Sequence, residues 1–155
     1  MNSMPQVAAL LFLILVSAFF SSSEISLASA SKTRLQALAD DGDRRATLVL
    51  DLQSHPGQFF SAIQIMVNAT ALLGGVIGDA AFSPFFAWVF EKLLPGHDLE
   101  HLAFVISFII ATMLFVIFAD LLPKRLAIAR PEAVAMFVVR PMNIIIKILR
   151  PLVYI

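Results

Sequence analysis

The sequence predicts an all-α integral membrane domain with three transmembrane helices, amphipathic juxtamembrane helices and one short re-entrant or interfacial helix. Three observations support this fold class. Hydrophobic residues make up 59% of the 155 residues and charged residues only 14%, against about 45–50% and about 25% in soluble domains. Three long segments carry no charged side chain, and lysine and arginine are concentrated in alternate connections between them.

This composition argues against a soluble enzyme. A soluble chain of this length has too little interior to bury so much apolar surface, so we expect the lipid bilayer to be its solvent. The net charge of zero gives no reason to expect nucleic acid as a partner. The chain has no cysteine for thiolate metal sites, and His55, His97 and His101 lack zinc-type spacing. We therefore expect no catalytic residues and no resident cofactor.

The first predicted span covers residues 4–28. Residues 1–23 carry no charged side chain, and the apolar stretch continues without a break into a run of serines. A cleaved signal peptide is the alternative, but such peptides begin with Lys or Arg and end at a small-residue cleavage site. We therefore expect a retained span.

Residues 32–53 have a different character. Apolar positions alternate with charges, and the stretch is interrupted by the turn-forming sequence DDGD at residues 40–43. This pattern predicts two amphipathic helices at the membrane surface. A solvated connecting helix is the alternative.

Two further spans are predicted over residues 56–78 and 102–119. They contain 23 and 18 residues without a formal charge, enough to cross the hydrocarbon core. The uncharged stretch at residues 80–90 is too short to cross, and it contains Pro84. We therefore expect a short re-entrant or interfacial helix there.

Three Arg-Pro pairs interrupt the apolar stretches after residue 129, with prolines at positions 131, 141 and 151. Because proline suits a helix start and disrupts a helix interior, the pattern predicts a broken juxtamembrane helix. The pattern is still running at Ile155. We therefore expect residues 1–155 to be the membrane domain of a longer protein, with a cytoplasmic regulatory part after residue 155.

The basic residues predict the orientation. Zero, four, one and six Lys or Arg residues lie before the first span, in the two connections, and after the third span. This alternation predicts an N-terminus outside and a C-terminus in the cytoplasm of a cell inner membrane. Three spans also require the termini to lie on opposite sides.

Polar groups inside a span are costly, so each one is a candidate functional residue. Ser22 and Ser26 share a helical face, and Glu24 lies at the end of the same span. Hydroxyl oxygens could bind a hard cation. The alternative is that small serines let helices pack closely.

The second span carries Asn68 near its middle, on the face of Ser61 and Gln64. Its carbonyl oxygen could bind a passing cation, or its amide could hydrogen-bond another helix. The glycines at positions 74, 75 and 78 precede Asp79. Close helix packing is the simpler explanation for them, although glycine also lets a ligand approach the backbone.

The third span ends at Asp120 and Pro123. Proline has no amide hydrogen, so the carbonyl of Ala119 would lose its helical partner. A freed carbonyl beside a carboxylate is a candidate cation port. The alternative is a simple helix stop, with Lys124 and Arg125 as interfacial anchors. Glu24 and Asp120 lie at the same predicted membrane face, which favours a positively charged cargo.

Three motifs carry a resemblance to a known family. They are FFSSSEISL at residues 19–27, FFSAIQI at residues 59–65 and FADLLPK at residues 118–124. In this order the chain resembles the transmembrane domain of the CorC/cyclin M family. The resemblance implies a homodimer with three spans, a juxtamembrane helix belt and a cytoplasmic nucleotide-sensing module.

The resemblance also implies cation export. In magnesium-exporting members, oxygens from the first span, the second span and the backbone near the final proline hold the ion. Carried to this sequence, the implied magnesium ligands are Ser22 and Ser26 with Ser23 as an alternative, Asn68, and Ala119 beside Pro123. Magnesium would then be cargo.

The sequence departs from that pattern, with Ala119-Asp120 where the family often has Gly-Glu. Residues 72–84 and 118–120 look more like the bacterial branch tied to export of cadaverine and putrescine. A diammonium cargo needs acceptors for two charged ends, which Glu24 or Asp79 with Asp120 could supply. We expect a polyamine exporter; magnesium or cobalt efflux and a non-transporting dimeric anchor for a cytoplasmic module are the alternatives.

Overall fold

The computed structural model describes residues 4–96 and 98–153, and every regular element in this part is helical. Three helical stretches are long and apolar enough to cross a membrane. They are α1 (Met4–Ser29), α4 (Pro56–Leu93), and the continuous path of α5 (Glu100–Phe115), the π-helix η1 (Val116–Leu121) and α6 (Leu122–Ala129). The predicted all-α class with three candidate membrane spans is confirmed.

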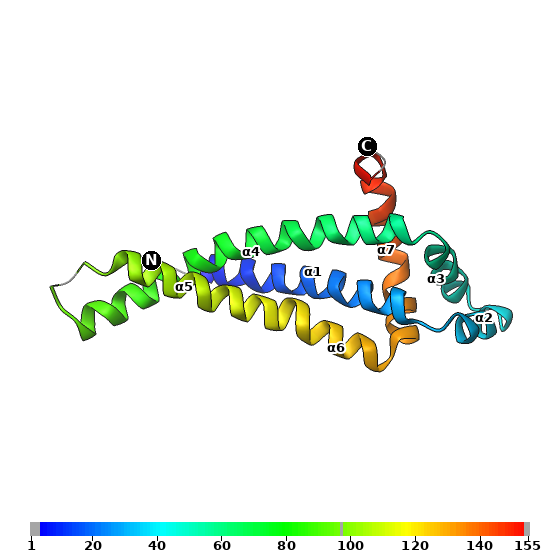
Figure 1. Ribbon diagram of the computed structural model, residues 1–155, viewed down its shortest axis with the longest axis horizontal. Helices are drawn as coiled ribbons and strands as arrows, with labels where there is room; N and C mark the ends of the chain where they lie inside the picture. Colours follow the sequence, from blue (N-terminus) through cyan, green and yellow to red (C-terminus); the bar gives the residue numbers. More distant parts are fainter. Residues whose placement is uncertain (1–3, 97, 154–155) are drawn as a thin grey trace.

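The three long helices form one elongated bundle (Figure 1). Helix α1 packs on both α4 and the α5–η1–α6 path, and α4 packs along α5. Helix α7 (Pro131–Val153) crosses the bundle at one end, where α2 (Lys32–Asp40) and α3 (Arg44–Ser54) also lie (Figure 1). We call this the α7 end of the molecule.

The connection between α1 and α4 consists of two helices, as the sequence predicts. Gly42 adopts a φ of 95° in the turn between them, and the Asp43 carboxylate caps α3 by accepting a hydrogen bond from the Arg45 amide. Gln53 on α3 donates hydrogen bonds of 3.0 Å to the carbonyls of Leu27 and Ala30. These carbonyls have no amide partner beyond the helix end, so α3 caps α1.

The separate short helix expected over residues 80–90 is not formed. These residues continue α4, which runs for 38 residues with Pro84 inside it. At 1.5 Å per residue the helix is about 57 Å long, well beyond a hydrocarbon core of about 30 Å. The end of α4 and the start of α5 therefore form a helical hairpin that extends past the N-terminal end of α1 (Figure 1).

The juxtamembrane helix is also unbroken, contrary to the prediction. Pro131 begins α7, while Pro141 and Pro151 lie inside it on exposed positions. One face of α7 packs against α1, α3 and α4, which offsets the hydrogen bond that each internal proline removes. The residues buried on this face are Ala135, Val138, Val139, Met142 and Ile146.

Two glycines let α4 and α5 pack closely. A Cβ atom on Gly74 would lie 2.5 Å from the Phe115 ring, and one on Gly78 would lie 2.8 Å from the Ala111 Cβ. The Phe115 ring can rotate away, but the Ala111 Cβ moves only with its backbone. Gly78 therefore sets the distance between the two helices.

We predict that Gly78→Ala lowers the stability of the protein by about 1–3 kcal/mol, because the added methyl overpacks a backbone contact. Gly75→Ala is the matched control. Its Cβ would lie 3.5 Å from Phe108, an ordinary contact, and alanine favours helix over glycine. Thermal unfolding in detergent, followed by circular dichroism, measures both. Equal melting temperatures for the two variants would contradict this packing model.

Glu132 joins α7 to the start of α2. Its Oε1 accepts a hydrogen bond of 3.1 Å from the Ser31 amide, and Arg34 lies 3.8 Å away. The amide hydrogen bond, with a smaller contribution from the Arg34 charge, holds the pKa of Glu132 below its ordinary value of 4.5. Ionised Glu132 is therefore favoured by folding.

The lowered pKa predicts the sign of a pH effect. The contribution of Glu132 to stability is present above pH 4.5 and is lost as the pH falls through the lower folded pKa. Glu132→Gln should therefore melt at a lower temperature than the wild type at pH 7, and the difference should shrink as the pH falls below 4.5. The control is Glu91→Gln, at an exposed position on the opposite end of the molecule. A difference that grows on acidification would refute this account.

Candidate functional site

Four polar side chains meet where α1 packs against η1 and α6. The Ser21 hydroxyl donates a hydrogen bond of 2.8 Å to Asp120 Oδ1. Lys124 Nζ lies 2.8 Å from the same oxygen and 3.4 Å from Glu24 Oε2. We call Ser21, Glu24, Asp120 and Lys124 the carboxylate–lysine cluster. It holds two carboxylates and one ammonium, so it carries one net negative charge when all three groups are ionised.

Helical spacing brings these residues together. Ser21 and Glu24 are three residues apart on α1, and Asp120 and Lys124 are four residues apart across the start of α6, so each pair shares a helical face. Packing of α1 against η1 and α6 then closes the cluster. The side chains of Glu24, Asp120 and Lys124 keep 26%, 32% and 29% of their surface exposed. The cluster is therefore partly accessible.

The π-helix η1 was not anticipated from the sequence. The Leu122 amide bonds to the carbonyl of Ile117, five residues earlier. An amide at position 123 would bond to the carbonyl of Phe118 in a π-helix or of Ala119 in an α-helix, but proline has no amide hydrogen. At least one of these two carbonyls therefore has no amide partner in the helix. Ala119 itself is fully buried against α1. The Ala119 carbonyl, which the sequence predicts to be freed, is one of these two, and its residue directly precedes Asp120 of the cluster.

The structure brings together the two carboxylates that sequence spacing left apart. Glu24 and Asp120 both contact Lys124, which was expected only as an interfacial anchor. Ser21 was missed as a site residue, although it precedes Glu24 by three residues. The four-residue spacing of Asp120 and Lys124 could have predicted their ion pair, because residues at this spacing share a helical face.

Three other serines of α1 bond within their own helix. Ser22 donates to the carbonyls of Ala18 and Phe19, Ser23 donates to Phe19, and Ser26 donates to Ser23. Ser23 and Ser26 are buried, whereas Ser22 is partly exposed. Ser22 and Pro123 both line an apolar groove between α1, α6 and α7. These hydroxyls keep their acceptor lone pairs, since each donates its hydrogen to a backbone carbonyl.

Asn68 does not join the cluster within a single chain. It is exposed on α4 and accepts a hydrogen bond of 3.3 Å from Gln64, which is also exposed, as is Ser61. The side chains proposed as magnesium ligands therefore point to different places, since Ser26 is buried on α1 while Asn68 faces outward. Within the residues described, no three His, Asp or Glu side chains gather as metal ligands.

Asp79 lies in a separate part of the bundle. Ser107 on α5 donates a hydrogen bond of 3.3 Å to Asp79 Oδ1. Ser107 precedes Asp120 by thirteen residues on one continuous helical path, so the two carboxylates are about 20 Å apart along the bundle. Asp79 therefore does not share a binding site with Asp120.

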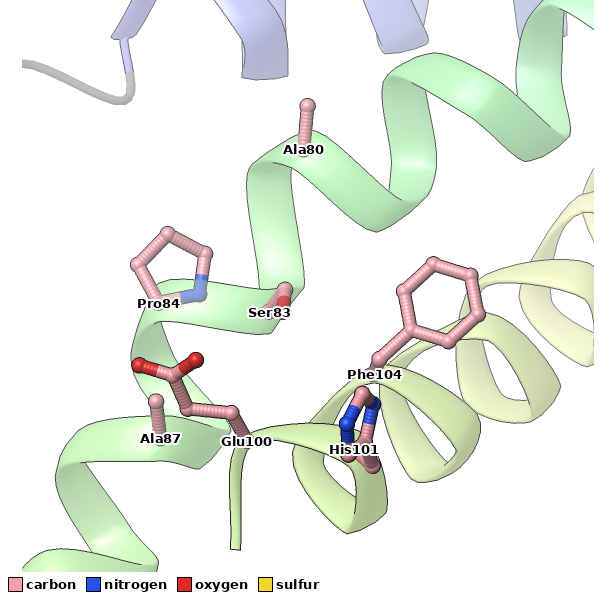
Figure 2. Close-up of a pocket in the computed structure, with 7 residues that line it drawn as sticks. All are labelled: Ala80, Ser83, Pro84, Ala87, Glu100, His101 and Phe104. Atoms are coloured by element: carbon pink, nitrogen blue, oxygen red, sulfur yellow. The ribbon is translucent and has the colours of Figure 1, made fainter. Parts of the chain in front are cut away.

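A cavity with both polar and apolar lining residues lies in the hairpin of α4 and α5, at the end away from α7. It has a volume of about 430 Å³ and is lined by Ala80, Ser83, Pro84, Ala87, Glu100, His101 and Phe104. Figure 2 shows Glu100 and His101 on α5 facing the α4 segment that carries Ser83 and Pro84. Most of its lining side chains are exposed or partly exposed, so it is an open cavity. His97 lies outside the described residues.

We predict that Ser21→Ala costs about 1 kcal/mol of stability, because it removes a hydrogen bond between two helices in the membrane region. Ser22→Ala is the matched control, since Ser22 bonds only to its own helix. It should change stability by a few tenths of a kcal/mol. Thermal unfolding in detergent compares the two variants. A larger loss for Ser22→Ala than for Ser21→Ala would rule out this role for Ser21.

Comparison with known proteins agrees with this architecture. Residues 8–155 match the family model described as the cyclin M transmembrane N-terminal domain. Similar proteins include the polyamine export protein of Haemophilus influenzae, which is 48% identical over 148 residues, covering 96% of this chain and 34% of the relative. The polyamine export protein of Salmonella typhimurium is 50% identical over 142 residues, covering 92% of this chain and 32% of the relative.

The polyamine export protein of Escherichia coli K12 is 47% identical over 148 residues, covering 96% of this chain and 33% of the relative. The chain thus spans about a third of the length of these relatives. The family model covers nearly the whole chain, and the three spanning helices agree with the membrane character that its description states. The chain belongs to the cyclin M transmembrane N-terminal domain family.

Proposed function

We propose that this domain is the membrane part of an exporter of small organic cations, with polyamines such as putrescine and cadaverine as the favoured cargo. The names of three relatives at 47–50% identity support an export role. The observation that carries the proposal is the carboxylate–lysine cluster, in which two carboxylates hold a primary ammonium between α1 and α6. The domain acts in transport and catalyses no reaction.

The cluster has the chemistry that an alkylammonium requires. A primary ammonium offers three hydrogen-bond donors and no acceptor, so it binds best to ionised carboxylates. Asp120 and Glu24 supply them, and the Ser21 hydroxyl orients Asp120 by donating to its Oδ1. Because the surroundings are apolar helices, the attraction between carboxylate and ammonium exceeds its value in water.

The same proposal includes the arrangement in the membrane. The distribution of basic residues supports an N-terminus outside and the α7 end in the cytoplasm of an inner membrane. The exposed amides of Gln64 and Asn68 support a homodimer, because a second copy would shield them from lipid. In this arrangement the cluster opens toward the cytoplasm, where an exporter loads its cargo.

Magnesium export is the alternative. The observation that favours it is the carbonyl left without an amide partner at Pro123, since Mg²⁺ binds oxygen ligands in near-octahedral geometry. Ser22, Ser26 and Asn68 would have to reorient toward that carbonyl, or a second copy would have to supply ligands. A non-transporting anchor for a cytoplasmic module is a further alternative, in which the polar groups of the spans serve assembly alone.

We predict that Asp120→Asn and Glu24→Gln each reduce putrescine export by at least about tenfold while leaving expression and assembly unchanged. Each variant removes one charge that binds the cargo and leaves Lys124 to neutralise the other. The intact protein in proteoliposomes, with putrescine, cadaverine and magnesium compared side by side, provides the measurement. Asp51→Asn, at an exposed position on α3, is the control.

The outcomes separate the candidates. Export of diamines that depends on Asp120 and Glu24 supports the proposal. Magnesium export without diamine export would establish the magnesium alternative. If none of the three cations is transported, the non-transporting anchor is the supported function. Wild-type diamine export by both carboxylate variants would remove the cluster from the transport path.

A further inference from the structure

The ammonium of Lys124 occupies the centre of the carboxylate–lysine cluster. Its Nζ lies 2.8 Å from Asp120 Oδ1 and 3.4 Å from Glu24 Oε2, and the Ser21 hydroxyl donates a hydrogen bond to the same Asp120 oxygen. The end of a lysine side chain is a four-carbon stem with a terminal ammonium. Putrescine has the same ammonium at each end of a four-carbon chain, so the two groups can make the same contacts.

We infer that Lys124 acts as a tethered substitute for the cargo. Its ammonium occupies the cation site when no cargo is bound, and it is displaced when an alkylammonium binds. This inference rests on the proposed function and adds a mechanism to it. It also assigns the cargo class, because a lysine can be exchanged most directly for another primary ammonium.

The position of Lys124 permits this exchange. It lies in the first turn of α6, and 29% of its side-chain surface is exposed. A long lysine stem can lie along apolar surface while its ammonium reaches water. Release of Lys124 therefore requires rotation of one side chain, and the helices can stay in place.

Charge balance explains why the empty site needs an internal cation. Without Lys124 the two carboxylates would face each other in an apolar setting, where like charges raise the cost of ionisation. With Lys124 in place, one net negative charge remains and attracts the cargo. A diammonium that enters with two positive charges can neutralise both carboxylates while Lys124 turns toward water.

Competition with Lys124 also sets the affinity. If Lys124 is turned away from the carboxylates in only a small fraction of the molecules, the apparent dissociation constant of the cargo equals its intrinsic value divided by that fraction. Return of Lys124 to the carboxylates then favours release of the cargo. The lysine thus keeps binding weak enough for turnover.

The competition predicts opposite effects of two substitutions, measured as putrescine binding to the intact protein by titration calorimetry in detergent. Lys124→Gln removes the competing charge and should lower the dissociation constant about tenfold, which corresponds to a shift of about 1.4 kcal/mol. Lys124→Arg places a guanidinium that can bind a carboxylate with two parallel hydrogen bonds. It should raise the dissociation constant by a similar factor.

A purely structural lysine would give the reverse order, because arginine would preserve the ion pairs and glutamine would lose them. Lys92→Gln is the control, since Lys92 lies over the Trp88 ring at the far end of α4. Circular dichroism and gel filtration check that each variant folds. If the glutamine variant fails to fold, the arginine variant decides, and an unchanged or lower dissociation constant for it would overturn the inference.

Two further outcomes separate this inference from the proposed function. Loss of export in Asp120→Asn together with weaker binding by Lys124→Gln would overturn the role of Lys124 while the proposed function stands. Absence of putrescine binding and export in the wild type would overturn both.

Discussion

In a bilayer every polar group on a spanning helix must find its partner inside the protein, because lipid offers none. The seam between α1 and the η1–α6 segment meets this constraint with one connected set of contacts. Asp120 accepts hydrogen bonds from Ser21 and Lys124, and Lys124 also pairs with Glu24. The same contacts hold two helices together and create a place where a cation is bound. The contact between these helices and the proposed transport activity therefore involve the same four side chains.

The close packing of the bundle positions that seam. Gly78 on α4 lies against Ala111 on α5, so these helices approach to the distance that their small residues allow. Fully buried Ala103 and Ala119 continue the row of small side chains along the α5–η1 path. The π turn adds one residue to the turn that carries Asp120, and Pro123 ends it. A local departure from α-helical pairing thus lies beside the candidate site, where such turns are frequent.

The α7 end joins the bundle to the amphipathic helices through polar contacts. Gln53 caps the carbonyl end of α1, and Glu132 accepts a hydrogen bond from Ser31 at the start of α2. Helix α7 buries one face against α1, α3 and α4 while Phe137, Ile144 and Ile148 remain exposed on the other. Any movement of α7 therefore acts directly on the helix that carries Ser21 and Glu24.

The sequence by itself determined the all-helical membrane fold, the first span and the turn at Gly42. Long uncharged stretches and local turn chemistry carry that information, and neither depends on distant partners. It also singled out Glu24 and Asp120 as costly polar groups. Local rules misplaced the helix boundaries at Pro84 and Pro141, because packing along α4 and α7 offsets the hydrogen bonds that these prolines remove. Only the tertiary structure decided that Glu24 and Asp120 share Lys124, that Asn68 faces outward and that Asp79 lies elsewhere. Which face of one helix meets another is set by the close packing of residues far apart in the sequence, so periodicity alone could not reveal it.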